Sequence, residues 1–163
     1  MAMKNNKQRK SWFGMQRERF GDNWATRIRP EDIYYNTYRI LLDIARGNFE
    51  MTNENNRDVT DLYNNPIILN NMIDYCGKKW AVFSEASNAI HRFINDPNVD
   101  ESLKTSNTSI SANLFHMAME CYKACYFDLD MFRQSGDIGY LYNLQSSLKT
   151  KGFRDFIDLN RCL

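Results

Sequence analysis

Residues 65–97 read NPIILNNMIDYCGKKWAVFSEASNAIHRFINDP, and this stretch decides the fold. Its large apolar residues recur at alternating steps of four and three, which is the period of one face of an α-helix. Asn65 and Pro66 are typical of a helix start, and Asp96 followed by Pro97 is typical of a helix end. Because the register continues through Gly77 without a slip, we predict one helix over residues 66–96. Its buried face is predicted to carry Leu69, Ile73, Cys76, Trp80, Phe83, Ser87, Ile90 and Ile94.

Three further segments have helical spacing. Residues 30–46 begin with a proline and two acids and end before Gly47, and residues 109–133 end before the Ser-Gly-Asp sequence at 135–137. A shorter helix then carries apolar residues from Ile138 to Leu148. No segment alternates with the two-residue period of a strand. The sequence therefore predicts an all-α protein, an antiparallel helical bundle around the two long helices.

Residues 48–64 are rich in asparagine and acids and only weakly periodic, so we predict a loop with room for one helical turn. At the carboxyl end, residues 153–163 place apolar residues at helical spacing. They are predicted to form either a final short helix or a docking tail.

The first 29 residues are predicted to form an extended or partly helical arm. Ser11 suits the cap of a short helical turn, whereas Gly14 and Gly21 argue against a long helix. Aromatic and apolar side chains alternate there with basic ones. Such a strap places its apolar side chains in pockets, either on its own body or on a neighbouring subunit. We expect removal of residues 1–29 to abolish assembly and leave the helices of the body intact.

Charge is distributed unevenly along the chain, although the net charge is only +1. Residues 1–30 hold eight basic and two acidic residues, whereas the remainder holds 13 basic and 18 acidic ones. A basic arm on an acidic body suits an anionic partner or the acidic surface of a neighbouring copy.

Three segments follow from these patterns: a basic aromatic arm (1–29), a helical body (30–152) and a C-terminal docking tail (153–163). The candidate partner-binding residues lie in the arm and the tail. They are Lys4, Lys7, Arg9, Lys10, Trp12, Phe13, Arg17, Arg19, Trp24, Phe153 and Phe156.

No motif indicates catalysis or metal binding. His91 and His116 have no nucleophile motif beside them, and His116 lies about 140° around the helix from Cys121 at 100° per residue. Asp96, Asn98 and Asp100 resemble the start of a calcium loop, but Glu101 stands where that loop needs glycine. We therefore predict a protein without enzymatic activity, cofactor or metal.

We also find no pattern of a targeting signal in the sequence. The polar stretch 1–10 is followed by no apolar run of the kind found in signal peptides, and no apolar run approaches the length of a transmembrane helix. The four cysteines form no CxxC pair and no secreted disulfide framework. We expect free thiols, no membrane association and synthesis in a cytoplasm.

A basic aromatic arm, a small helical body and an apolar tail together resemble the head–tail adaptor (neck or ring) proteins of tailed bacteriophages, particularly short-tailed and crAss-like ones. The resemblance covers the whole chain through its size, helical content and Asn/Tyr-rich composition. It implies a structural virion protein, made in the host cytoplasm, that forms a homo-oligomeric ring of commonly twelve copies. Such a ring sits beneath the portal, contacts portal and other neck or tail proteins, and lines the channel through which DNA passes.

A second hypothesis from another class stays open beside this one. Lysine and arginine interleaved with tryptophan and phenylalanine can follow a phosphate backbone and stack on bases. The chain would then be a small nucleic-acid-binding regulatory protein that uses the arm directly. Binding of free DNA or RNA that weakens steeply with salt distinguishes this regulator from an adaptor.

Overall fold

A computed structural model describes residues 9–150, and every regular element within that range is helical. The helices pack against one another, which confirms the predicted all-α class. In chain order the elements are α1 (Trp12–Phe20), η2 (Trp24–Thr26), α2 (Pro30–Arg46), α3 (Arg57–Asn64), α4 (Pro66–Asn95), η3 (Glu101–Leu103), α5 (Ser106–Ser135) and α6 (Gly139–Thr150).

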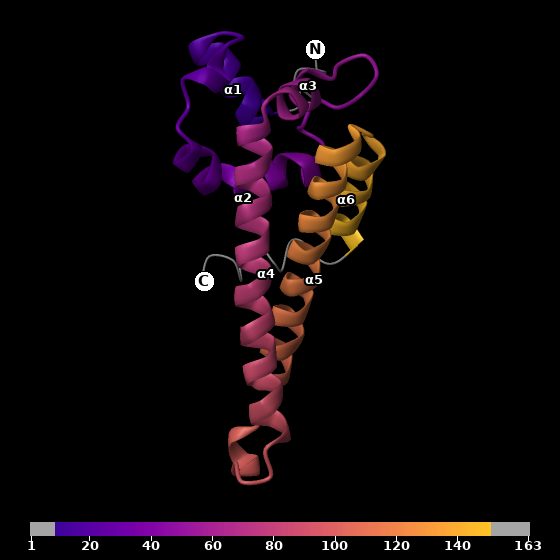
Figure 1. Ribbon diagram of the computed structural model, residues 1–163. Coiled ribbons are helices and arrows are strands. Elements are labelled where there is room, and N and C mark those ends of the chain that lie inside the picture. Colours follow the sequence, from indigo (N-terminus) through magenta and orange to yellow (C-terminus); the bar gives the residue numbers. More distant parts are fainter. Residues whose placement is uncertain (1–8, 151–163) are drawn as a thin grey trace, which may run out of the picture.

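The long helices α4 and α5 form an antiparallel hairpin, as predicted (Figure 1). α4 is continuous through Gly77, where a Cβ atom would lie 3.2 Å from Cε2 of Tyr126 on α5. Glycine thus lets the Tyr126 ring lie close against the α4 backbone. α5 is longer at both ends than the predicted helix over residues 109–133. Thr105 caps its first turn, and Gly136 adopts the left-handed conformation directly after its last turn.

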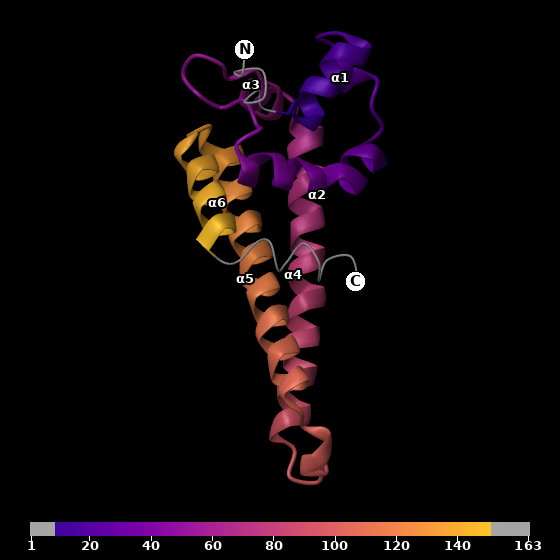
Figure 2. The same ribbon diagram turned by 180° about the vertical axis from the view of Figure 1, so that it is seen from behind.

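The remaining helices gather at one end of this hairpin, where α2 crosses α4 and α6 lies along α5 (Figures 1 and 2). Apolar residues of α2, α3, α4 and α6 form the core between them, including Ile40, Leu62, Met72 and Leu144, each fully buried. Hydrogen bonds also join α6 to the earlier part of the chain. Gln145 Nε2 donates to the carbonyl of Ile44 at 2.8 Å, and Tyr142 donates to that of Met51 at 2.9 Å. We call this end of the molecule the head.

Residues 48–64 differ from the predicted loop. They include α3, whose Val59 and Leu62 are buried in the head and whose Asp58 is fully buried. Two buried apolar side chains in eight residues are too few to produce a readable helical period. Contacts with the rest of the head, rather than the local sequence, therefore stabilise α3.

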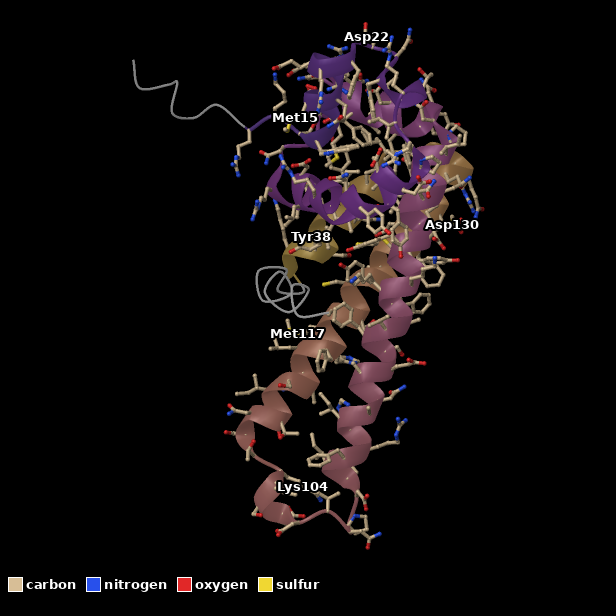
Figure 3. All side chains as sticks on the ribbon, turned by 90° about the vertical axis from the view of Figure 1, so that its left-hand side faces the viewer. Met15, Asp22, Tyr38, Lys104, Met117 and Asp130 are labelled. Carbon is tan, nitrogen blue, oxygen red and sulfur yellow. The ribbon has the colours of Figure 1, made fainter. Side chains whose placement is uncertain are left out.

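The other end of the hairpin extends well beyond the head. We define the distal hairpin as residues 80–119, where α4 and α5 have each other as neighbours among the residues that the structure describes (Figures 1 and 2). Figure 3 shows Lys104 at its tip and Met117 part of the way towards the head, far from Asp22 and Met15. Two helices alone cannot cover both faces of either helix, so much of the distal hairpin is open to other molecules.

Candidate functional site

Part of the predicted arm belongs to the head. Residues 12–20 form α1, and the Ser11 hydroxyl accepts a hydrogen bond from the amide of Gly14, which caps the helix. The helix continues through Gly14 and ends at Gly21. Ser11 therefore caps a helix, as expected, but that helix is longer than the short turn that the sequence predicted. Lys4, Lys7, Phe153 and Phe156 lie outside the described residues 9–150.

The aromatic residues of the arm are buried in this chain. Trp12, Phe13 and Trp24 have exposed fractions of 8%, 1% and 0%. The ring centre of Trp24 lies 5.8 Å from that of Trp12 and 5.0 Å from that of Phe13, and Phe13 packs in turn on Phe49. The interpretation of these three as anchors for another molecule is therefore wrong; they fill a pocket on their own body, the alternative that the sequence left open.

Arg17 is held by three acidic side chains of the same chain. Its guanidinium donates hydrogen bonds to Asp58 and Asp61 at 2.7 Å each and to Glu50 at 2.9 Å. Its side chain is only 8% exposed, and that of Asp58 is fully buried. Burial lowers the pKa of Arg17, but the hydrogen bonds and charges of Asp58 and Asp61 outweigh it and raise the pKa above the ordinary value. Arg17 is thus a structural cation and is not free to contact a partner.

Two further buried contacts fix the start of α1. The Ser11 hydroxyl donates to Asp58 at 2.6 Å, and the Trp12 amide donates to Asp43 on α2 at 2.7 Å. Burial raises the pKa of Asp58, and the Glu50 amide, Ser11 and Arg17 offset part of that effect. Burial also raises the pKa of Asp43, against the Trp12 amide and Arg39. These carboxyl groups attach α1 to α2 and α3.

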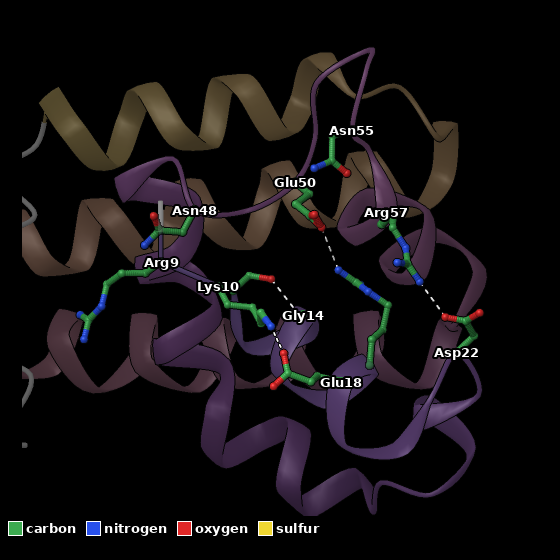
Figure 4. A pocket seen from close by; sticks show the side chains of 11 residues that line it. Arg9, Lys10, Gly14, Glu18, Asp22, Asn48, Glu50, Asn55 and Arg57 are labelled. Atoms are coloured by element: carbon green, nitrogen blue, oxygen red, sulfur yellow. Dashed lines mark hydrogen bonds and ion pairs between the residues drawn. The ribbon is translucent and has the colours of Figure 1, made fainter. Parts of the chain in front are cut away.

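A cavity of about 470 Å³ opens between α1 and the segment that leads into α3 (Figure 4). Basic residues line it, but acidic ones neutralise most of them. Lys10 is paired with Glu18, and Arg57 with Asp22 at 2.6 Å. Arg9 is exposed and takes part in no ion pair among residues 9–150. Such a lining does not form a continuous basic surface for a phosphate backbone.

Arg19, the last candidate of the arm, is exposed on α1. Its guanidinium lies 5.1 Å from the centre of the Phe20 ring. The exposed candidates within the described range are therefore Arg9, Lys10 and Arg19. They retain the predicted basic character, without the aromatic residues that were expected to accompany them.

The distal hairpin provides a different candidate surface. Leu103, Ile110 and Val82 are 59%, 54% and 44% exposed. The stretch 105–119 contains no Asp, Glu, Lys or Arg, although it covers nearly four turns of helix on an open hairpin. Depletion of charge combined with exposed apolar side chains is typical of protein interfaces. Sequence reasoning missed this surface, although the charge-free stretch was a readable signal for it.

Other kinds of site find no support in the described range. No group of three or more His, Cys, Asp or Glu residues between residues 9 and 150 could hold a metal ion. Among the same residues, no helix combines the length and hydropathy needed to cross a membrane. Cys76, Cys121 and Cys125 are buried and form no disulfide bond with one another.

Comparison of the chain with protein-family models, with curated proteins and with solved structures finds no match to any of them.

Proposed function

We propose that this chain is a non-catalytic structural subunit that assembles with other protein chains through its distal hairpin. The observation that carries the proposal is the open apolar surface of the hairpin, with Leu103 59% and Ile110 54% exposed beside a charge-free stretch of α5. Burial of such apolar surface against another chain lowers the free energy by roughly 25 cal/mol for each Å² removed from water.

The resemblance supplies the form of the proposed assembly. The chain would be one subunit of a head–tail adaptor of a tailed phage. Copies of it would form a ring beneath the portal, which extends the DNA channel and becomes part of the virion. The geometry supports this reading in one respect, since a compact head with a long projecting hairpin offers two separate regions for contact with neighbours (Figure 1). Arg9, Lys10 and Arg19 remain candidates for contact with an acidic neighbour.

The nucleic-acid-binding alternative loses part of its basis. It requires aromatic side chains that can stack on bases, yet Trp12, Phe13 and Trp24 are in the core. Arg17 is bound by carboxylates as well. A gel-shift series with free duplex DNA at rising salt tests this directly. The proposed structural subunit predicts weak binding even at low salt, whereas the regulator predicts tight binding that falls steeply.

Sedimentation velocity of the full chain over a range of concentrations tests the assembly itself. We expect mass above that of one chain, and we expect Ile110→Asp to shift the distribution towards the single chain. Ile110 is exposed, so the variant keeps its fold, which circular dichroism checks. Asn143→Asp adds the same charge at an exposed position on α6, in the head and away from the distal hairpin, as a matched control. A chain that stays monomeric at every concentration, or equal behaviour of the two variants, would contradict the proposal.

A further inference from the structure

A second row of apolar residues runs along α4 within the distal hairpin. Val82, Ala86, Ala89 and Phe93 follow one another at steps of four, three and four, which is the spacing of a coiled-coil seam. The row begins one residue before Phe83, so it lies about 100° around the helix from the row that faces α5. Val82 and Phe93 are 44% and 36% exposed, whereas Phe83 is fully buried. α5 therefore covers one row of α4 and leaves the next row open.

The open row occupies the length of α4 that is free of the head. At the head end, the Lys78 ammonium lies 5.3 Å from the centre of the Tyr34 ring on α2, and α4 ends at Asn95. Residues 79–95 rise by about 25 Å at 1.5 Å per residue. A second helix of this length fits against α4 without meeting α2 if it runs antiparallel, because the two heads then lie at opposite ends of the pair.

Two opposite charges flank the row on the side away from α5. Glu85 and Arg92 are both exposed and stand seven residues apart. Ion pairs along one helix need a separation of three or four residues, so these two cannot pair with each other. Neither takes part in an ion pair with any other residue between 9 and 150.

An antiparallel second copy would both cover the apolar row and pair the two flanking charges. When Ala86 faces Ala89 of the second copy, Val82 faces Phe93, and each small residue meets a small one while the larger side chains lie outside them. The same register brings Glu85 opposite Arg92 of the second copy, twice over, because the arrangement is twofold. A parallel pair would instead place like residues opposite one another and leave both charges unpaired.

The ends of the hairpins are complementary in the same register. The tip of each hairpin carries Asp96, Asp100 and Glu101 against one basic residue, Lys104. It reaches the part of the second copy where Lys79 lies, at the head end of α4, beside Lys78, which is already paired with Asp74 at 3.1 Å. The acidic tip of each copy thus lies near Lys79 of the other at both ends of the pair.

We propose that the row Val82, Ala86, Ala89 and Phe93 binds α4 of a second copy of this chain, antiparallel, with Glu85 of each copy paired with Arg92 of the other. The inference rests on the proposed function in taking protein association as the purpose of the hairpin. A twofold contact closes on itself and makes a pair of subunits. A ring therefore needs another contact, elsewhere on the chain.

Charge reversal tests the pairing, with sedimentation velocity as the measurement. Glu85→Arg alone places arginine opposite arginine, and Arg92→Glu alone places glutamate opposite glutamate. We expect each single variant to raise the dimer dissociation constant about tenfold, since two favourable pairs become two repulsive ones. An equimolar mixture of the two single variants restores both pairs and is expected to form a heterodimer of wild-type affinity. The double variant E85R/R92E is expected to recover as well.

Asn143→Arg and Asn143→Glu are the matched controls. Asn143 is exposed on α6 in the head, with no charged residue three or four positions away, and both variants are expected to dimerise like wild type. A mixture no tighter than its components overturns the antiparallel pairing. Association of the wild type that no charge reversal changes also overturns the pairing but leaves the proposed function standing. A wild-type chain that stays monomeric overturns both.

Discussion

Arg17 on α1 donates a hydrogen bond to Asp58 on α3 at 2.7 Å, across 41 residues of sequence. Asp58 is fully buried and also accepts hydrogen bonds from the Ser11 hydroxyl and the Glu50 amide. A buried carboxylate requires such partners, because its desolvation penalty is several kcal/mol without them. The N-terminal segment therefore completes the head electrostatically as well as through its aromatic core.

Arg17→Ala is expected to lower the free energy of unfolding by about 3–5 kcal/mol, because it leaves Asp58 buried without its cation. Urea denaturation followed by circular dichroism measures the change. Arg19→Ala on the same helix is the control, and with an exposed side chain over Phe20 it is expected to cost about 1 kcal/mol or less.

Arg17→Lys provides a second measurement if the alanine variant does not fold. Lysine keeps the charge but loses the planar fork that reaches three carboxylates, so an intermediate loss is expected. Equal stability of the wild type and both Arg17 variants would show that the buried ion pair contributes nothing.

Trp24→Ala is expected to lower the free energy of unfolding by about 3–5 kcal/mol, since it empties a fully buried site between Trp12 and Phe13 and removes a hydrogen bond to Asp61. Urea denaturation measures this loss.

Because these aromatic residues are part of the core, removal of residues 1–29 is expected to reduce the helical content of the remainder, contrary to the expectation from sequence. Removal of residues 1–8 is the control, because it leaves every described contact in place. Circular dichroism and thermal unfolding of both truncated chains provide the comparison, and an intact, stable 30–163 chain would refute it.

The helices that sequence predicts best are those that carry a long row of their own. α4 shows eight apolar or small residues at helical steps, and α2 has a proline at one end and a glycine at the other. Each pattern can be read without knowing what the helix packs against. α1 and α3 have no such row. They are stabilised instead by long-range contacts, such as those between Arg17 and Asp58 and between Phe13 and Phe49, and a local sequence pattern does not record such contacts.

The candidate surface was harder to predict for a related reason. Sequence correctly places the row that contains Phe83 on the buried face, because that row extends over the whole of α4, but it does not show whether a further element covers the shorter row that begins at Val82. Only the antiparallel packing of α4 on α5 identifies Val82 and Phe93 as exposed. In the arm, likewise, the interleaving of basic and aromatic residues fits a free strap and a docked helix equally well.

Gly136→Ala is expected to cost more than Gly47→Ala. Both glycines end a helix in the left-handed conformation, with φ of 70° and 80°. A Cβ at Gly136 would lie 2.9 Å from Cε1 of Tyr63, whereas a Cβ at Gly47 meets nothing within 4 Å. Gly47→Ala thus measures the backbone strain alone, about 1 kcal/mol, and the additional loss at Gly136 measures the contact with Tyr63. Chemical denaturation of the two variants is the test, and equal losses would show that Tyr63 moves aside freely.

Asp128 on α5 gives the protein a defined pH dependence. Burial raises the pKa of its carboxyl group to about 6, whereas the unfolded chain titrates near 4. Between these values the folded state binds more protons than the unfolded state, so the contribution of Asp128 to stability falls as pH rises from about 4 to 6. Above that window the full penalty of a desolvated carboxylate is present, about 1–2 kcal/mol once solvent screening of this partly exposed group is included.

Asp128→Asn removes the titration, so the variant is expected to be more stable than wild type at pH 7.5 by about that amount, and no more stable at pH 4. Urea unfolding of both proteins at the two pH values isolates the effect, because every other titrating group is common to both. Glu54→Gln, an exposed carboxylate in the segment before α3, is the control and should give the same small difference at each pH. A stability difference between the Asp128 variant and wild type that does not change with pH would mean that the amide acts through packing and that the carboxyl group carries no desolvation penalty.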